Sequence, residues 1–332
     1  MAGAGGCGRR QRSVGQLVAR QLHKVGIDYR CHGSTVTTGF NTFMTNARRS
    51  TALGYALLAP SLFAVVAFLL LPIMVVVWLS LHRWDLLGPI EYVGLDNWRS
   101  VLTDRVFGNS LLVTLAFVAI VVPTQTVLGL LAAWMLTRGL PGSGVFRTVY
   151  VLPWICAPLA IAVLWRWILA PTDGALSALS GQRIEWLTDP GLALPVVSAV
   201  VVWTNVGYVA LFFVAGILAI PAEVYAAAST DGATAWQRFR HITLPMLRPT
   251  MSFVLITGIV SAAQVFDTVY ALTRGGPRGH TDLVAMRIYA EAFGSATIGR
   301  AAVMAVLLFV ILVGVTVVQH LYFRRRISYD LA

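Results

Sequence analysis

Residues 221–245 read PAEVYAAASTDGATAWQRFRHITLP, a polar-rich segment between two strongly apolar runs. The sequence predicts a helix over Glu223 to Ser229, followed by the turn dipeptide Asp231-Gly232, in which glycine can adopt a positive φ. A second short helix is predicted over Ala233 to His241, with Pro245 ending it before the next apolar run. Two short helices around a glycine turn would form a compact knob that fits a groove in a partner.

The side chains of this segment suit that interpretation. Ala226, Ala227 and Ala228 are small and permit close approach of another backbone. Trp236 and Phe239 lie at helical spacing and form an apolar stripe, which Ile242 would extend. The alternative is an amphipathic connector that lies on a membrane surface.

The composition indicates a membrane protein. The chain has 332 residues, of which 57% are hydrophobic and only 12% are charged. Such a chain is too apolar for a soluble globular protein. A membrane-spanning helix needs about 20 mostly apolar residues. Six stretches qualify: Ala52–Ser80, Ser110–Leu136, Thr148–Ala170, Pro195–Ile220, Thr250–Tyr270 and Ala301–Phe323. We therefore predict an all-α polytopic membrane domain with six transmembrane helices over residues 52–323.

The charge distribution predicts the orientation of these helices. Both tails (residues 1–51 and 324–332) and the loops 137–147 and 221–249 hold 16 of the 25 basic residues, against four of the 14 acidic ones. The intervening loops are nearly balanced. The positive-inside rule then places both termini and the 221–249 loop in the cytoplasm. The net charge of +11 follows from this asymmetry. A nucleic-acid partner would require a basic face on a soluble domain, and the sequence shows no such domain.

The N-terminal tail carries no information about the activity. It is rich in glycine and arginine and is expected to be disordered. Met44 precedes the first apolar stretch, so translation beginning there is an alternative to a genuine tail. Cys7, Cys31 and Cys156 show no metal-binding or redox spacing and are expected to be free thiols.

Polar residues within the apolar stretches are candidates for a translocation path. Asn205 and Tyr208 lie in the fourth stretch, and Gln264 and Asp267 lie in the fifth at i,i+3 spacing, which predicts a shared helix face. Aromatic faces, amides and carboxylates are the groups that bind sugars. The alternative role is hydrogen bonding between helices. Arg166, between two tryptophans, is interpreted as part of a membrane-interface belt.

Four sequence segments carry a family resemblance. They are Val93-Gly-Leu-Asp-Asn-Trp98, Phe146-Arg-Thr-Val-Tyr-Val-Leu-Pro153, the 221–245 segment, and Leu272-Thr-Arg-Gly-Gly-Pro277 with Thr281 beyond it. With these segments the chain resembles the permease subunits of binding-protein-dependent ABC importers. The Gly-Gly-Pro turn and the Gly-Leu-Asp-Asn segment narrow the resemblance to the sugar subfamily, which includes the maltose and glycerol-3-phosphate systems. The implied fold is that of a type I importer permease.

The resemblance implies that residues 221–245 form the segment on which the ATPase docks, here called the docking segment. Its implied contact residues are Glu223, Ala226, Ala227, Ala228, Asp231, Gly232, Ile242 and Pro245. The family usually has glutamate where this chain has Ala226. Because an exposed ion pair contributes about 1 kcal/mol or less, we expect altered rather than lost docking.

The implied partners are a second homologous permease, an ATPase dimer, an extracytoplasmic substrate-binding protein and membrane lipid. The implied location is a bacterial plasma membrane. The sequence contains no GxxxxGK[ST] loop, so ATP would bind the partner ATPase, and the chain itself is expected to need no cofactor and to catalyse no reaction.

Two other classes remain as alternatives. One is a secondary transporter driven by an ion gradient, with Asp267 as its ion site. The other is a membrane-embedded enzyme using Asp267 and Arg166, against which the absence of clustered titratable residues in the apolar stretches argues. The substrate within the sugar-like class stays open.

Overall fold

The computed structural model describes residue 55, residues 57–138 and residues 143–324. The chain divides between Leu69 and Leu70 into two units. In the first unit the described residues are helical. Met44, Cys7, Cys31 and both predicted tails lie outside the described residues, apart from Arg324.

The elements are almost all helical. In chain order they are η1 (Val66–Leu70), α3 (Leu71–Ser80), β1 (His82–Arg83), β2 (Glu91–Tyr92), α4 (Asp96–Leu102), α5 (Arg105–Leu136), α6 (Ser143–Ile155), α7 (Pro158–Ile168), α8 (Ala175–Ser180), α9 (Ala193–Leu218), α10 (Ala222–Thr230), α11 (Ala235–Arg238), η2 (Phe239–Thr243), α12 (Leu244–Met246), α13 (Arg248–Ala263), α14 (Asp267–Leu272), α15 (Val284–Tyr289), η3 (Ala290–Gly294) and α16 (Ile298–Arg324). The η segments are π-helical turns, and β1 and β2 form an antiparallel hairpin.

Within the described residues, five helices are long and apolar enough to span a membrane, or six if one bent pair is a single span. The five are Leu57–Ser80, Arg105–Leu136, Ala193–Leu218, Arg248–Leu272 and Ile298–Arg324. These helices confirm the predicted all-α polytopic membrane fold.

The third predicted span differs from the continuous helix that we expected. It consists of α6 and α7, which are bent by 95° at the break between them. Cys156 and Ala157 separate the two helices, and Pro158 opens α7, where a missing N–H costs nothing. Apolarity alone predicted the span, but the proline determines where the helix is interrupted.

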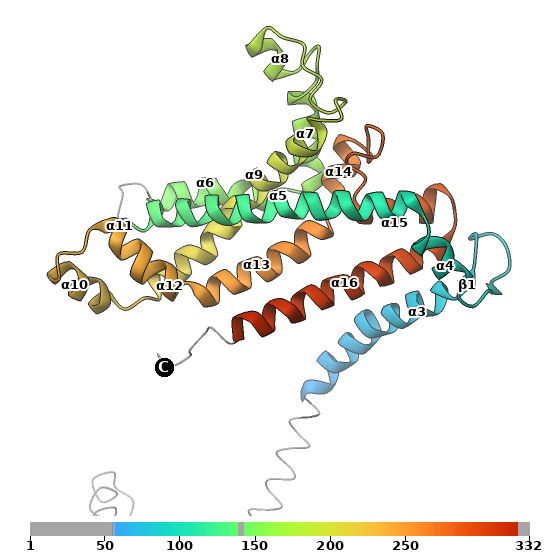
Figure 1. Ribbon diagram of the computed structural model, residues 1–332, viewed down its shortest axis with the longest axis horizontal. Coiled ribbons are helices and arrows are strands. Elements are labelled where there is room, and N and C mark those ends of the chain that lie inside the picture. The colour runs from blue at the N-terminus through green and yellow to red at the C-terminus, as the bar shows by residue number, and fades with distance from the viewer. Residues whose placement is uncertain (1–54, 56, 139–142, 325–332) are drawn as a thin grey trace, which may run out of the picture. The chain divides into compact units, whose positions relative to one another are not determined.

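α5 and α9 form the centre of the unit, with α6 packed on α9 and α13 on α5 (Figure 1). The α6–α9 contact is unusually close at Gly207. A Cβ atom at Gly207 would lie 1.8 Å from the Tyr150 carbonyl oxygen. Only glycine, which has no Cβ, permits this approach.

The docking segment joins the core at one end of these helices. Phe239 and Leu247 are buried in one apolar cluster with Leu136 of α5 and Phe213 of α9. In Figure 1, α10 to α12 lie at one end of the helices, and α4, α15 and β1 lie at the opposite end.

At the opposite end, the Gly-Leu-Asp-Asn-Trp segment has a structural role. The Asn97 side-chain amide donates to the carbonyl oxygens of Ser80 (3.1 Å) and His82 (2.9 Å), and the Trp98 indole N–H donates to the Ser80 hydroxyl (3.2 Å). The short helix α4 thereby caps the end of the first span. The Asp-Asn-Trp part of the segment forms the first turn of α4.

Asn97→Ala should reduce the free energy of unfolding by about 1–3 kcal/mol, because two backbone acceptors lose a buried donor. Thermal unfolding in detergent would measure the change. Arg99→Ala is the matched control, since Arg99 is an exposed residue of the same helix. An Asn97→Ala protein as stable as the Arg99→Ala protein would contradict this account of the segment.

Candidate transport path and docking surface

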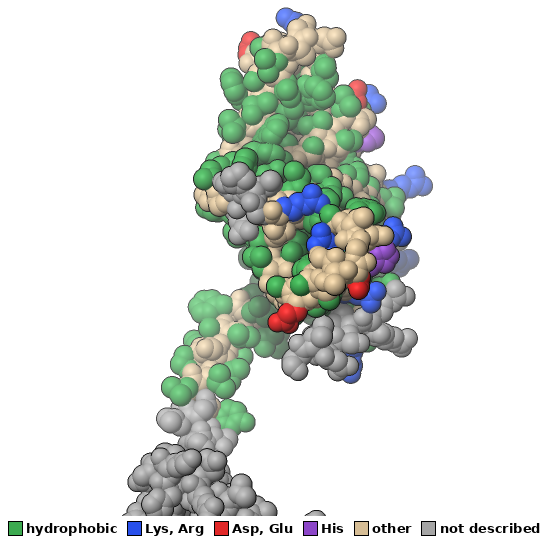
Figure 2. Space-filling model, turned by 90° about the vertical axis from the view of Figure 1, so that its left-hand side faces the viewer, with side chains coloured by type: hydrophobic (Ala, Val, Ile, Leu, Met, Phe, Trp, Pro, Cys, Tyr) green, Lys and Arg blue, Asp and Glu red, His purple; other side chains and the backbone are tan. Residues whose placement is uncertain are grey.

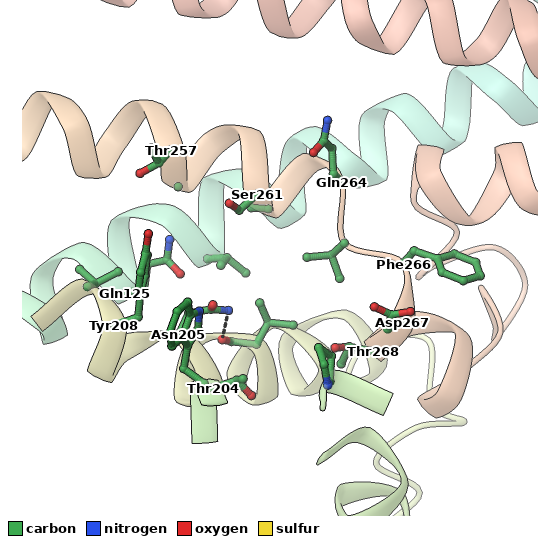
Figure 3. Close-up of a pocket in the computed structure, with 18 of the residues that line it drawn as sticks. Gln125, Thr204, Asn205, Tyr208, Thr257, Ser261, Gln264, Phe266, Asp267 and Thr268 are labelled. Carbon is green, nitrogen blue, oxygen red and sulfur yellow. Dashed lines mark hydrogen bonds between the residues drawn. The ribbon is translucent and has the colours of Figure 1, made fainter. Parts of the chain in front are cut away.

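The four predicted path residues line one cavity of about 240 Å³. Asn205 and Tyr208 come from α9, Gln264 from the end of α13, and Asp267 from the start of α14. Figure 3 shows the cavity between these elements, with Gln125 of α5 on the same wall as Tyr208. The structure thus brings together all four residues from two spans that are distant in sequence.

Aromatic and amide groups form one wall of this cavity. Tyr208 stacks on Trp154 of α6, with ring centroids 4.5 Å apart and planes 17° from parallel. The Asn205 amide donates to the carbonyl of Val201 at 2.9 Å (Figure 3), which leaves its side-chain oxygen as an acceptor. A flat aromatic surface beside polar groups is suited to a sugar ring and its hydroxyls.

The predicted shared helix face of Gln264 and Asp267 is wrong. α13 ends at Ala263, Gln264 is its C-cap, and α14 begins at Asp267. In Figure 3 the Gln264 side chain extends away from Asn205, whereas the Asp267 carboxylate projects at the cavity. The carboxylate thus lies at the start of α14, directly after the break of residues 264–266 in the fifth span.

Other polar residues of the cavity were missed from the sequence. They are Gln125, Thr204, Thr257, Ser261 and Thr268. Gln125 is 4% exposed and makes no hydrogen bond among the described residues. Because buried polar groups are normally paired, its amide is available to a molecule in the cavity. A glutamine within an apolar span is the signal that would have identified it.

The cavity carries little charge. Asp267 is the one ionisable carboxylate among its described lining residues, and no arginine, lysine or histidine lines it. The rest of its polar lining consists of hydrogen-bonding side chains from α5, α9, α13 and α14, together with Gln264 between α13 and α14.

The docking segment is exposed. Glu223, Ala226, Ala227, Asp231 and Gly232 are all exposed. Figure 2 views this end of the molecule and shows basic and acidic side chains around the docking helices. Ala228 and Ile242 are half-buried.

The glycine turn of the segment is confirmed. Gly232 has a φ of +75°, and a Cβ there would meet nothing within 4 Å. The position therefore needs glycine for its backbone angle alone. α10 covers the predicted first helix, with Ala222 and Thr230 as its ends.

The predicted end of the second helix is wrong. Helical structure begins at Ala235 and continues through η2 into α12, and Pro245 lies in the first turn of α12. The start follows from a capping box, in which Thr234 accepts from the Gln237 N–H and the Gln237 side chain accepts from the Thr234 N–H. Proline is tolerated in a first turn, so Pro245 does not end the helical structure, which continues to Met246.

Several contacts hold the docking segment together and fix it to the core. The Tyr225 hydroxyl lies 2.9 Å from that of Thr243, and Arg238 donates to the Ser229 hydroxyl at 2.8 Å. The Phe239 ring packs on Trp134 of α5, with centroids 5.0 Å apart. These contacts connect α10 to α5 through α11 and η2.

The aromatic pair around Arg166 is only partly at the surface. Trp165 packs edge-on against Trp203, with centroids 5.4 Å apart, whereas Trp167 is exposed. The Arg166 guanidinium donates to the Ala271 carbonyl at 3.4 Å, which connects α7 to α14. Its place in a membrane-interface belt stays a prediction.

The broken apolar helices, the polar cavity among them and the exposed knob at one end define a membrane transport component. Residues 125–328 match the family described as "Binding-protein-dependent transport system inner membrane component". The chain belongs to this family of ABC importer permeases, and the gradient-driven alternative is not favoured.

Its relatives include sugar and glycerol-phosphate permeases. The chain is 34% identical to the trehalose/maltose transport system permease protein MalF of Thermococcus litoralis, over 81% of this chain and 93% of the relative. It is 35% identical to the sn-glycerol-3-phosphate transport system permease protein UgpA of Agrobacterium fabrum, over 83% of this chain and 96% of the relative.

The fold is also found in a solved structure. A subunit of a bacterial ABC transporter involved in the import of the acidic polysaccharide alginate aligns with a TM-score of 0.75. The alignment covers 86% of this chain and 100% of that chain at 22% identity, which supports the fold alone.

Proposed function

We propose that this chain forms half of the path of an ATP-driven importer and conducts a neutral sugar or polyol. The observation that carries the proposal is the cavity of Asn205, Tyr208 and Asp267, whose walls include helices that also contact the docking segment. The relatives named for trehalose, maltose and glycerol 3-phosphate support a sugar or sugar-like solute.

Coupling follows from the way in which two helices connect the ends of the molecule. α5 contacts Phe239 through Trp134 and carries Gln125 in the cavity. α13 begins directly after the buried Leu247 and carries Ser261 in the cavity. Movement of the docking segment by an ATPase would therefore shift both walls of the cavity.

The rest of the transporter supplies what this chain lacks. A second permease would complete the path, an ATPase dimer would bind ATP and dock on residues 221–245, and an extracytoplasmic binding protein would deliver the solute. Both termini and the docking segment would lie in the cytoplasm, as the basic residues of these regions predict.

The cavity favours a neutral solute over an anionic one. A phosphate or carboxylate group would meet the Asp267 carboxylate, and the described lining residues offer no cation to offset the repulsion. Hydroxyl groups can instead donate to Asp267 and exchange hydrogen bonds with Asn205 and Gln125.

Asp267→Asn should lower uptake of a neutral sugar about tenfold at limiting substrate, because a hydrogen bond to a charged acceptor contributes about 1.5–3 kcal/mol. Radiolabelled uptake, normalised to the amount of complex in the membrane, measures the effect. Asp173→Asn is the matched control, since Asp173 is an exposed residue of another loop. Equal uptake by the two variants would remove Asp267 from the path.

The function itself is tested in proteoliposomes that contain the complete transporter and its binding protein. Uptake of maltose or trehalose should require internal ATP and persist after ionophores collapse all ion gradients. Glycerol 3-phosphate should be a poor substrate. Uptake that does not depend on ATP and stops when the ionophore is added would contradict the assignment as an ATP-driven importer. Preferred uptake of glycerol 3-phosphate would contradict only the assignment of a neutral solute.

A further inference from the structure

An open basin of about 600 Å³ lies at the end of the helices opposite the docking segment. It is formed by the start of α5, the turn at residues 274–279 and α15. Four arginines line it: Arg105, Arg274, Arg278 and Arg287. The one carboxylate among its described lining residues belongs to Asp282.

The acidic residues near the basin are already paired. Arg300 lies 2.6 Å from a Glu291 oxygen and 2.7 Å from an Asp104 oxygen. Asp282 accepts from the Ser110 hydroxyl at 2.9 Å and lies 3.8 Å from Arg287, which also lies 3.6 Å from Glu291. These three carboxylates are therefore engaged with Arg300, Arg287 and Ser110.

The pKa values of two of these carboxylates shift in opposite directions. Burial would raise the pKa of Asp104, but the Val106 N–H and Arg300 lower it below its ordinary value. For Asp282, burial raises the pKa above its ordinary value, although Ser110 and Arg287 oppose the shift. Among the described residues, neither carboxylate forms an ion pair with the three outer arginines, Arg105, Arg274 and Arg278.

Those three arginines, Arg105, Arg274 and Arg278, are exposed and form no ion pair with any described residue. The Arg274 guanidinium lies over the Tyr270 ring, 5.8 Å from its centroid. A cation–π contact of this kind leaves the positive charge in place. The extracytoplasmic loops as a whole carry nearly equal numbers of acidic and basic residues. Against this balance, the three arginines place unpaired positive charge together at the basin.

The turn that carries two of the arginines is well fixed. The hydroxyl of the buried Thr281 lies 2.7 Å from that of Thr273 and also donates to the Gly276 carbonyl. Arg274 and Arg278 have φ values of +52° and +49°. This region costs a residue other than glycine about 1 kcal/mol or more. The loop thus holds arginine where glycine would be less strained.

We propose that this basin, the arginine basin, receives an acidic surface of the extracytoplasmic substrate-binding protein. This inference rests on the proposed function, which requires such a partner. Exposed arginines around an open concavity are typical of protein interfaces, where they accelerate association and fix orientation. A small anion is less well suited, because water would screen it from three exposed guanidinium groups.

The test uses the complete transporter in lipid nanodiscs and the binding protein isolated with it. The double variant Arg105→Glu/Arg278→Glu should weaken binding at least tenfold in low salt, mainly through slower association, and the difference should shrink as salt is raised. Arg183→Glu is the control, since Arg183 is an exposed arginine of another extracytoplasmic loop. Arg278→Lys should retain most of the affinity.

Three outcomes decide the inference. Loss of affinity in the double variant and not in Arg183→Glu supports it. Unchanged affinity in all variants, while the wild-type transporter shows ATP-driven uptake, overturns the arginine basin and leaves the proposed function intact. A third result would also overturn it in favour of a small-anion site. In that result, millimolar inorganic phosphate displaces the binding protein from the wild-type transporter, but the arginine-to-glutamate substitutions do not themselves change the affinity for the binding protein.

Discussion

Gly207→Ala should destabilise the protein by about 3 kcal/mol, the upper end of the cost of overpacking, and should abolish transport. The added Cβ would lie 1.8 Å from the Tyr150 carbonyl oxygen and 3.0 Å from the Val151 nitrogen. Both are backbone atoms, which cannot rotate away as a side chain would. α6 and α9 would have to separate, and the stacked pair of Trp154 and Tyr208 would separate with them.

The control for this prediction is Gly314→Ala in α16, where an added Cβ meets nothing within 4 Å. That variant should be as stable as wild type or slightly more so, because alanine favours a helix over glycine. Thermal unfolding and solute uptake, measured side by side, compare the two. If Gly207→Ala unfolds at the wild-type temperature and transports normally, the close α6–α9 contact is wrong.

Ala227→Arg should lower ATP-coupled uptake at least tenfold while leaving the unfolding temperature unchanged. The Ala227 side chain is exposed, so arginine meets no clash within the chain. A long charged side chain on a small-residue surface would instead prevent close approach of the ATPase. A tenfold loss corresponds to about 1.4 kcal/mol, a modest part of a protein interface.

Ala178→Arg is the matched control, because Ala178 is an exposed alanine on α8, outside the docking segment. It should leave uptake and ATP hydrolysis unchanged. The Ala227→Arg transporter should still bind its substrate-binding protein, since that site lies elsewhere. Full ATP-coupled uptake by Ala227→Arg would show that α10 does not contact the ATPase.

Much of the architecture could be predicted because apolar runs of about 20 residues have few other uses. The first helix and the turn of the docking segment were predictable because alanine favours a helix and glycine readily adopts a positive φ, whereas its docking role was implied only by the family resemblance. Asn205 and Asp267 could be singled out because polar groups within apolar spans are costly and are therefore usually paired or functional; the structure shows that both line the cavity.

The breaks within the spans could not be predicted from the same patterns. Mean apolarity does not mark Cys156 or Gln264 as a break, so a span and a pair of bent helices look alike in sequence. Pro245 was misread for a related reason, since proline ends a helix in its interior but fits its first turn. The arginine basin depends on which carboxylates pair with Arg300, a fact that only tertiary structure contains.

The most direct test of the account places a photoreactive side chain at position 227 of the full-length chain and irradiates intact membranes. The account predicts an adduct with an ATPase subunit whose yield changes when ATP is trapped, and no such adduct from the same group at position 178. An intact, active transporter that gives no ATPase adduct from position 227 would contradict the claim that ATP hydrolysis is coupled through residues 221–245.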